Sequence, residues 1–308
     1  MAIKSVEIRD FRVFKGKFEE EFCPGVNIFV GDNGTGKTTL IREMYSHSDT
    51  NEYLCDFENK KHQTILSVFE PGEKAHFHTN FINEFDNRHA LFIPEKDILE
   101  HAKGLLTFIE QKQTGFSHIY RDLLIAAQDI PTQHQTEMQK SIGEKIASLI
   151  GGTIEWDKGD GSYYTIKTDG NRIPFANEAS GYKKLGFLGL LVSSGQLKPG
   201  TILFWDEPEN SLNADIIPKL AEILLELAQN DIQIFLATHD YNLARYFDVR
   251  KDKSTPVLFH NLSKASEGGI VCHSSPEYVK LPGNLMEKAS EDLFKAVVAD
   301  ALEVQDNE

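Results

Sequence analysis

Residues 31–38 read Gly-Asp-Asn-Gly-Thr-Gly-Lys-Thr, which matches the pattern G-x-x-x-x-G-K-[ST] at every fixed position. The match follows an apolar, strand-like run, Val26 to Val30, and precedes a segment that we expect to be helical. In this context the pattern wraps backbone N–H groups around phosphates at a helix N-terminus. The sequence therefore predicts a strand, a phosphate-binding loop and a helix.

Side chains of this loop carry specific roles in the prediction. Lys37 is expected to reach the β- and γ-phosphates of ATP, and the Thr38 hydroxyl is expected to bind Mg²⁺. The candidate nucleotide-binding residues of the loop are Asn33, Gly34, Thr35, Gly36, Lys37, Thr38 and Thr39. The alternative is a glycine-rich turn that matches the pattern by chance. The strand-like run before the motif and the helical segment after it both argue against this alternative.

A second pattern is the apolar run Thr201 to Trp205, which ends in Asp206-Glu207-Pro208. A buried strand of an α/β sheet presents its carboxyl end to the ligand crevice. We therefore expect Asp206 to hold Mg²⁺, directly or through water, and Glu207 to orient or deprotonate the attacking water. An ordinary acidic loop is the alternative interpretation.

Composition limits the kinds of partner. The chain has 308 residues, 40% hydrophobic and 26% charged, with a net charge of −15. This is the composition of a globular protein. The negative net charge lowers the expectation that the chain binds nucleic acid without a partner. The longest apolar run, Leu185 to Val192, is too short to span a bilayer, and no signal-peptide pattern opens the chain. We expect a cytoplasmic protein without membrane insertion.

The three cysteines, Cys23, Cys55 and Cys272, are far apart and lack CxxC spacing. We interpret them as reduced thiols that form neither a metal site nor a disulfide framework.

The chain divides into three predicted parts: 1–96, an N-terminal ATPase lobe with the phosphate loop; 97–150, a helical insertion; and 151–308, a C-terminal lobe. Strands and helices alternate after residue 175, which predicts parallel pairing. Asp160-Gly161 and Asp169-Gly170 are hairpin signals, and residues 10–16 are expected to form a turn. The insertion is either a scaffold or a moving arm that contacts a partner, and periodicity alone leaves both open.

The order of the motifs, ending in Ala237-Thr238-His239-Asp240, is that of ABC-type ATPases. The opening, Phe11 to Gly16 followed by Gly25 to Gly34, resembles the SMC, RecF and OLD branch. The whole chain resembles bacterial AAA/ABC-like ATP-binding proteins of the "putative AbiEii toxin" domain group, through Phe92 to Lys96 and Asp206 to Asn210. The resemblance implies an α/β P-loop NTPase of ABC/SMC-like type, with a mostly parallel core sheet, an antiparallel β portion and a helical insertion.

The resemblance also implies further site residues. Ser180 and Gly181 stand where ABC proteins have the signature loop, which contacts ATP held by the other subunit; the alternative is a plain helix N-cap at Ser180. His239 matches the switch histidine, which acts at the γ-phosphate; the alternative is a structural histidine at a strand end. Arg12 matches an arginine that contacts nucleotide; the alternative is a surface charge in a turn. Asn213 replaces the aspartate common in the D-loop, which puts a cross-subunit water contact in doubt.

Glu95 has two interpretations, a Mg²⁺ oxygen ligand or an acid at the start of the following helix, and we favour the helix start. For function, we expect an ATP-hydrolysing switch that forms a homodimer around two ATPs and controls a partner protein encoded nearby, in phage defence or a toxin-like system. The alternatives are the ATP-binding subunit of a transporter and a DNA-repair ATPase that acts on nucleic acid. An OLD-like nuclease is disfavoured, because the chain contains no Asp-x-Asp.

Overall fold

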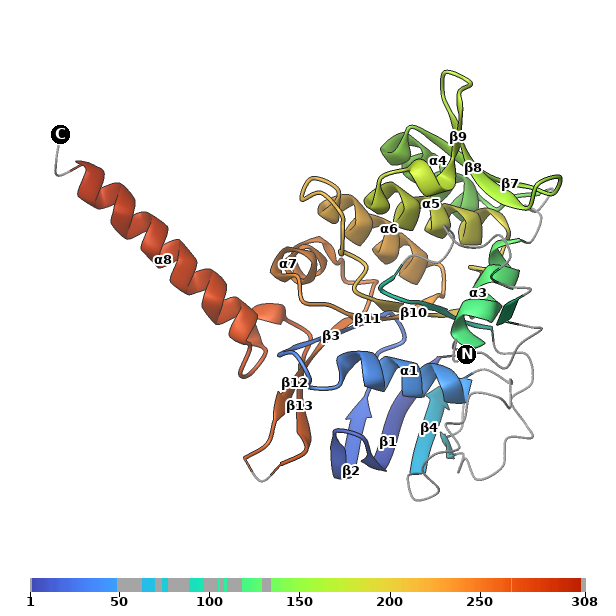
Figure 1. Cartoon of the computed structure of the whole chain (residues 1–308). Coiled ribbons are helices and arrows are strands. Elements are labelled where there is room, and N and C mark those ends of the chain that lie inside the picture. Colours follow the sequence, from blue (N-terminus) through green and yellow to red (C-terminus); the bar gives the residue numbers. More distant parts are fainter. Residues whose placement is uncertain are drawn as a thin grey trace.

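The structure, a computed structural model, describes residues 2–48, 63–69, 74–76, 89–96, 105, 108–109, 118–128, 134–266 and 268–305. Figure 1 shows the arrangement of the elements. The larger described elements are β1 (Ile3–Phe11), β2 (Phe14–Glu21), β3 (Val26–Gly31), α1 (Lys37–Ser48), β4 (Gln63–Phe69), β5 (Lys74–His76), β6 (Ala90–Ile93), α3 (His118–Ala127), α4 (Glu137–Ile150), β7 (Gly152–Asp157), β8 (Ser162–Lys167), β9 (Arg172–Pro174), α5 (Ser180–Ser193), β10 (Ile202–Asp206), α6 (Ile217–Gln229), β11 (Gln233–Ala237), α7 (Tyr241–Arg250), β12 (Val257–Lys264), β13 (Ile270–Ser275) and α8 (Leu285–Gln305).

The central sheet has six described strands in the order β13-β12-β3-β11-β10-β6. The five strands from β12 to β6 are parallel, and β13 joins the edge antiparallel to β12. Strands β10 and β11 are buried at every position, as expected for parallel strands covered on both faces. Helix α1 packs on one face, and α5, α6 and α7 lie on the other (Figure 1). The predicted parallel α/β core is confirmed.

Alternation along the strands divides the buried side chains into two clusters. On the central strands most aliphatic residues, with Trp205 and Phe259, belong to the cluster that includes α5, α6 and α7. Another four side chains belong to the cluster that includes α1 and the antiparallel sheet: Phe29, Phe92, Phe204 and Phe235. Four phenylalanines and one histidine form a row of stacked rings across five strands. Their centroids are 6.5, 5.0, 6.4 and 4.9 Å apart in the order Phe92, Phe204, Phe235, Phe29 and His260. The row joins the β6 edge to β12 and passes behind the phosphate loop.

Two further sheets are antiparallel, with the orders β2-β1-β4-β5 and β7-β8-β9. The second contains both predicted hairpins, whose turn glycines Gly161 and Gly170 have φ of 69° and 84°. The turn expected over residues 10–16 is shorter, because β1 continues to Phe11 and β2 begins at Phe14. Asp10 and Arg12 have φ of 53° and 52°, and the Asp10 carboxylate accepts a hydrogen bond from the Gly16 N–H at 2.9 Å. The expectation was wrong because left-handed residues and a side-chain bond allow a tighter connection.

Helix α4 is packed on α5 rather than standing apart. Its start is fixed by a reciprocal capping box between Thr136 and Gln139, and it ends at Gly151 with φ 67°. The Gln139 amide donates to the Val192 carbonyl of α5 at 3.0 Å, and Ile146 packs close to Gly189. For residues 137–150 the structure therefore supports the scaffold interpretation of the helical insertion; most of residues 97–117 lie outside the described residues.

The C-terminal region contains two strands that sequence analysis did not identify, β12 and β13. It ends in α8, which projects away from the body (Figure 1). Large apolar side chains of α8 are exposed to solvent: Leu285, Leu293, Phe294, Val297 and Val298. Within the described residues, no helix is long and apolar enough to cross a membrane.

Candidate ATP site

The predicted phosphate loop connects β3 to α1. Gly34 and Gly36 have φ of 76° and 93°, a backbone conformation that L side chains rarely adopt. A Cβ added at Gly36 would lie 2.6 Å from Val13, so the β1–β2 connection supports the loop from below. The Thr35 hydroxyl donates to the Asp32 carbonyl at 2.8 Å. These contacts hold the loop in a tight curve at the N-terminus of α1, as phosphate binding requires.

Lys37 is held inside this curve. Its ammonium donates to the carbonyls of Gly31 at 2.7 Å and Asp32 at 3.0 Å, and only 5% of the residue is exposed. Burial lowers the pKa of Lys37 to about 8, although the carboxylate of Glu207 and other nearby acids oppose the shift. The loop therefore contains a desolvated cation, which interacts more strongly with phosphate than an exposed lysine would.

Thr38 and Asp206 meet across 168 residues of sequence. The Thr38 hydroxyl donates to Asp206 Oδ1 at 2.9 Å, and Asp206 is 3% exposed. Burial raises the pKa of Asp206, while the hydrogen bond from Thr38 lowers it. Both side chains offer oxygen ligands at the end of β10, which is the donor chemistry that Mg²⁺ requires. The two predicted metal-binding residues thus fit the ion.

Glu207 directly follows β10 in a left-handed conformation, with φ 47°. Its N–H donates to the Ala237 carbonyl at 2.8 Å, and its carbonyl accepts from the Lys184 ammonium at 2.8 Å. Burial, together with the Glu95 and Asp206 carboxylates, raises the pKa of Glu207. A non-glycine residue held at positive φ costs about 1–3 kcal/mol and persists only where neighbours fix it. Here bonds from β11 and α5 fix the backbone of the predicted catalytic base.

His239 lies beside Glu207, with His239 Nε2 3.6 Å from Glu207 Oε1. Burial and the charge of Lys37 lower the pKa of His239, which favours the neutral ring at pH 7. Glu209 positions the histidine from below, because its Oε1 accepts from the Thr238 hydroxyl at 2.7 Å and from the His239 N–H at 3.1 Å. The structure therefore brings the predicted water-activating and switch residues together.

Glu95 belongs to this site, although sequence analysis favoured a helix start for it. Its carboxylate accepts from the Asn210 amide at 3.0 Å, and its charge raises the pKa of both Asp206 and Glu207. The parallel pairing of β6 with β10 places the residues after both strands at the same edge. Glu95 lies within the Phe92–Lys96 segment, but neither its spacing nor that of Lys184 shows that the two side chains reach this site, so a correct strand order was also needed to identify them.

The predicted signature residues lie at the start of α5. Ser180 is the first residue of the helix and is exposed, while the N-cap is Ala179 and makes no side-chain capping bond. The alternative interpretation of Ser180 as the N-cap was therefore wrong. A Cβ on Gly181 would lie 2.8 Å from the Ser211 carbonyl, so α5 packs tightly on the loop after Glu207. Within the described residues, no hydrogen bond joins Ser180 to the phosphate loop of the same chain.

Arg12 occupies the β1–β2 connection next to Val13, which supports Gly36. It is exposed, has positive φ, and its guanidinium carbon lies 5.2 Å from the Phe11 ring centroid. This position is near the phosphate loop and leaves its contact with nucleotide a prediction.

Comparison with protein families decides what kind of site this is. The family described as "AAA domain, putative AbiEii toxin, Type IV TA system" matches residues 82–245, more than half of the chain. The chain belongs to this family. The family described as "AAA ATPase domain" matches residues 1–89, which include the phosphate loop. The protein is thus an AAA-domain ATPase with an ABC-like arrangement of motifs, and this family membership implies nucleotide binding.

Curated relatives of this AAA-domain ATPase include DNA replication and repair proteins RecF. The protein from Oenococcus oeni is 27% identical over 131 residues, which cover 34% of this chain and 35% of the relative. The protein from Streptococcus uberis is 36% identical over 72 residues, which cover 21% and 20%. The chain therefore matches only a minor part of these relatives.

Solved structures support the fold of the AAA-domain ATPase over most of its length. The SMC head domain from Thermotoga maritima has a TM-score of 0.51 at 15% identity, covering 88% of this chain and 98% of that one. An Smc head domain with an extended coiled coil, bound to the C-terminal domain of ScpA derived from Pyrococcus furiosus, has a TM-score of 0.51 at 10% identity, covering 96% and 99%. This similarity confirms the predicted SMC-like fold.

Proposed function

We propose that this ATPase is a switch in which two copies close on two ATPs and separate after hydrolysis. The observation that carries the proposal is the separation of two half-sites within one chain. The phosphate loop, Asp206 and Glu207 form one half, and the exposed Ser180 at the start of α5 forms the other. A two-fold, head-to-tail pairing would let each copy complete the site of its partner.

The start of α5 is chemically suited to this role. The first turn of a helix has free N–H groups and a partial positive charge, and no side chain caps them here. In the proposed dimer they would contact the γ-phosphate bound by the other copy, together with the Ser180 hydroxyl. Because the N-terminus carries no acidic residue in its first turn, nothing there would repel the phosphate.

Helix α5 also connects the two half-sites of its own chain. Lys184 donates to the backbone carbonyl of Glu207, and Gly181 packs against the backbone of Ser211. A movement of the loop after β10 during hydrolysis would therefore shift the residues presented to the other copy. This linkage gives the switch a route by which hydrolysis in one site weakens the dimer.

For the chemistry, Lys37 would bind phosphate oxygens, while Thr38 and Asp206 would hold Mg²⁺, which neutralises phosphate charge. Glu207 would orient or deprotonate water, and its raised pKa makes it a stronger base than an exposed glutamate. His239, next to Glu207, would contact the γ-phosphate. We place this reaction in the cytoplasm, where both ATP and Mg²⁺ are available.

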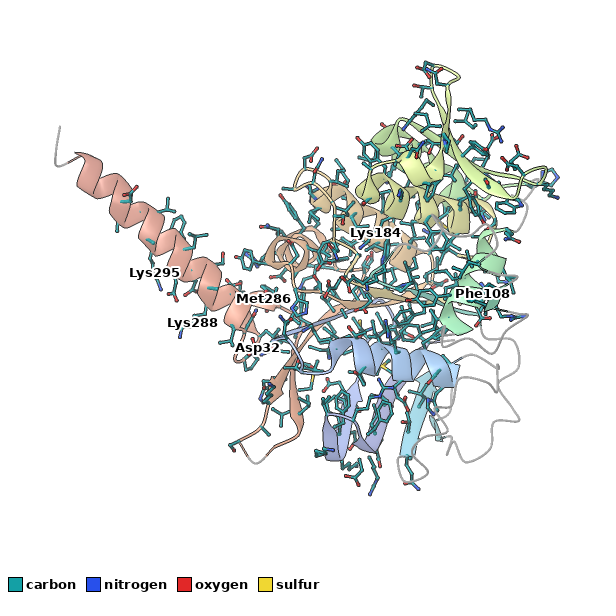
Figure 2. The ribbon with its side chains drawn as sticks, in the orientation of Figure 1. Asp32, Phe108, Lys184, Met286, Lys288 and Lys295 are labelled. Carbon is teal, nitrogen blue, oxygen red and sulfur yellow. The ribbon has the colours of Figure 1, made fainter. Side chains whose placement is uncertain are left out.

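Helix α8 would add a second contact between the copies. A small cavity is lined by Gly31 and Asp32 of the phosphate loop and by Asn284, Leu285 and Met286 at the start of α8. Figure 2 shows Asp32 and Met286 together at the foot of the helix. The approaching copy must place its Ser180 near this same loop. The exposed apolar stripe of α8 is therefore continuous with the proposed interface, and we assign the second copy as its occupant.

Light scattering of Glu207→Gln tests the dimer. This variant should retain ATP, so we expect monomers without nucleotide and dimers with ATP and Mg²⁺. Adding Ser180→Arg should prevent the dimer, because a large cation would fill the space of the γ-phosphate. Ser148→Arg, on the exposed face of α4, is the matched control and should not prevent the dimer. Dimer formation that ignores both nucleotide and Ser180 would refute the shared site.

We further propose that the switch controls an effector protein in phage defence or a toxin-like system; the family description supports this only by naming a putative toxin of a Type IV TA system. The expected result is an ATP-dependent complex when Glu207→Gln is captured from its native host during phage challenge. Capture of the same partner by Lys37→Ala, which cannot reach the ATP state, would contradict control by the switch.

The RecF matches favour a DNA-repair ATPase as the second candidate. In that case duplex or single-stranded DNA should stimulate ATP hydrolysis at physiological salt. The net charge of −15 argues against a dominant phosphate-backbone contact. Strong DNA stimulation would therefore replace the effector model.

A further inference from the structure

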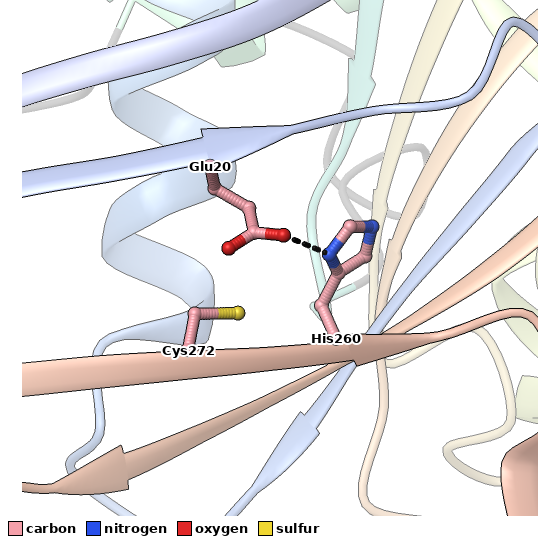
Figure 3. A group of neighbouring side chains, drawn as sticks. All are labelled: Glu20, His260 and Cys272. Atoms are coloured by element: carbon pink, nitrogen blue, oxygen red, sulfur yellow. Dashed lines mark hydrogen bonds and ion pairs between the residues drawn. The ribbon is translucent and has the colours of Figure 1, made fainter. Parts of the chain in front are cut away.

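Three side chains with metal-binding chemistry meet away from the ATP site: Glu20 of β2, His260 of β12 and Cys272 of β13 (Figure 3). Their ligand atoms all lie within 4.8 Å of one another. His260 is fully buried, whereas Glu20 and Cys272 are partly accessible, so an ion could enter from their side. The sequence gives no sign of this group, because its members are up to 252 residues apart.

The orientation of His260 is fixed by Asn27 behind it. The Asn27 amide donates to the Cys23 carbonyl at 2.9 Å, and its Oδ1 accepts from the Cys23 N–H at 2.9 Å. These two bonds determine which end of the amide is oxygen. His260 Nε2 lies 3.3 Å from that oxygen and therefore carries a proton and donates to it. Histidine ligands of metals are held by such a contact at the ring nitrogen that does not bind the ion.

The other ring nitrogen of His260 then faces the group of potential ligands. Nδ1 lies 3.0 Å from Glu20 Oε1 and 2.8 Å from the Ser274 hydroxyl, and that hydroxyl donates a hydrogen bond to Glu20 Oε1. If the buried ring is neutral, its Nδ1 lone pair points at a carboxylate oxygen. Two acceptors at this distance repel each other unless a proton or a metal cation lies between them.

We propose that Glu20, His260 Nδ1 and Cys272 form a binding site for a divalent transition metal, with zinc as the expected ion. Zinc takes mixed nitrogen, oxygen and sulfur ligands, and a water molecule or Ser274 would fill the fourth position. Bond lengths in tetrahedral zinc sites place nitrogen and oxygen ligands about 3.3 Å apart and nitrogen and sulfur about 3.6 Å apart. The present spacing reaches these values with small side-chain movements.

The charges of the proposed site also balance. Zinc brings two positive charges, and the Glu20 carboxylate and the Cys272 thiolate bring one negative charge each. Binding releases the thiol proton of Cys272 to solvent, and no oxidation or reduction occurs. A neutral set of this kind is compatible with a partly buried position.

The metal would join the two sheets that flank the phosphate loop. Glu20 belongs to the antiparallel sheet, whereas His260 and Cys272 belong to the edge of the central sheet. Strand β12 pairs with β3, which leads into the phosphate loop, and the His260 ring stacks on Phe29 with centroids 4.9 Å apart. We therefore expect a structural role, in which the ion clamps β2 to β12 and β13. This role does not depend on the proposed dimer.

Metal titration of the chelator-treated, full-length protein tests the site. The expected result is one zinc per chain, bound with a dissociation constant below about 1 µM, and a rise in melting temperature. Cobalt(II) in its place should give a thiolate-to-metal absorption band, since that band requires a coordinated cysteine. Cys272→Ser should abolish the band, and Cys272→Ser and Glu20→Gln should each weaken zinc binding at least about tenfold.

Cys23→Ser is the matched control, because Cys23 holds Asn27 only through its backbone; it should bind zinc as the original chain does. Absence of stoichiometric binding, or unchanged zinc affinity in Cys272→Ser, would overturn the proposal. His260 and Glu20 would then form a metal-free charge pair, and Glu20→Gln would lower the melting temperature equally with and without zinc. ATP hydrolysis is measured in parallel, so that a failure of the metal site can be distinguished from a failure of the proposed ATP switch.

Discussion

The two half-sites for ATP differ in how completely one chain builds them. On the phosphate side, Lys37, Thr38 and Glu207 are fixed by hydrogen bonds to β3, β10, β11 and α5. On the signature side, Ser180 is exposed at an uncapped helix start, although Gly181 beneath it is tightly packed. The first half-site can bind phosphate within one chain, whereas the second presents unsatisfied N–H groups outward. The proposed dimer would account for this difference, because the signature side would then act on ATP held by a second copy.

The largest expected effect is on turnover. Glu207→Gln keeps the shape of the side chain but removes the base, so ATP hydrolysis should fall about 10²- to 10⁴-fold. Nucleotide binding should remain, because Lys37 and Thr38 are unchanged. Glu155→Gln, an exposed substitution on β7, serves as the control in a phosphate-release assay. A wild-type rate in Glu207→Gln would remove the proposed catalytic role from the phosphate side.

Lys37→Ala should weaken ATP binding about 100-fold or more, because the phosphates lose a desolvated cation and its charge-assisted hydrogen bonds. Fluorescence of a labelled ATP analogue would measure the affinity. Lys253→Ala, an exposed lysine after α7, should bind as the original chain does. Equal affinity for both variants would mean that the phosphate side does not depend on its buried cation.

Disrupting α8 tests the outward-facing region. Phe294→Asp with Val297→Asp should weaken the ATP-dependent dimer of Glu207→Gln about tenfold or more, because charge enters an apolar contact. The affinity of the monomer for ATP should not change. Ala296→Asp places a charge on the opposite side of the same helix and is the control. Unchanged dimerisation in the double variant would show that the stripe contacts something other than a second copy.

The pH dependence of ATP binding should report the burial of Lys37. Its pKa is lowered to about 8, so the ammonium is charged below pH 8 and loses its proton above it. Affinity for a non-hydrolysable ATP analogue should therefore be constant near pH 7 and fall up to tenfold per pH unit above about 8, as each unit removes tenfold of the charged form. Constant affinity between pH 7.5 and 9.5 would contradict a desolvated lysine in the free protein.

The smallest effect concerns the contact between Asn210 and Glu95, which are both close to the carboxylates of the phosphate side. Asn210→Ala removes one exposed hydrogen bond of about 0.5–1.5 kcal/mol, so the rate of hydrolysis should fall only a few-fold. Asn171→Ala, in the β8–β9 turn, is the control. A loss as large as that of Glu207→Gln would give Glu95 a direct part in the chemistry.

Sequence reasoning succeeded where neighbouring residues act together. The glycines and Lys37 of the phosphate loop share one turn, and Asp206 and Glu207 end one strand, so their roles follow from spacing. Reasoning from spacing left Glu95 with two interpretations, and it could not show that the Glu95 carboxylate contacts the Asn210 amide. It also missed β12 and β13, although the short apolar run Val257 to Phe259 was available as a strand signal.

The sequence by itself determined the phosphate loop, the acidic end of β10 and the alternation of strands and helices, because these depend on local backbone geometry and on periodic burial. The tertiary structure decided which distant segments meet. The order β13-β12-β3-β11-β10-β6 places Glu95 beside Asp206, and the packing of β2 against β13 brings Glu20 to His260 and Cys272. Local periodicity shows that a strand is buried but carries no information about its neighbours. The exposure of α8 also depends on packing, because the apolar periodicity of a helix is the same in the sequence whether its apolar face is buried or exposed to solvent.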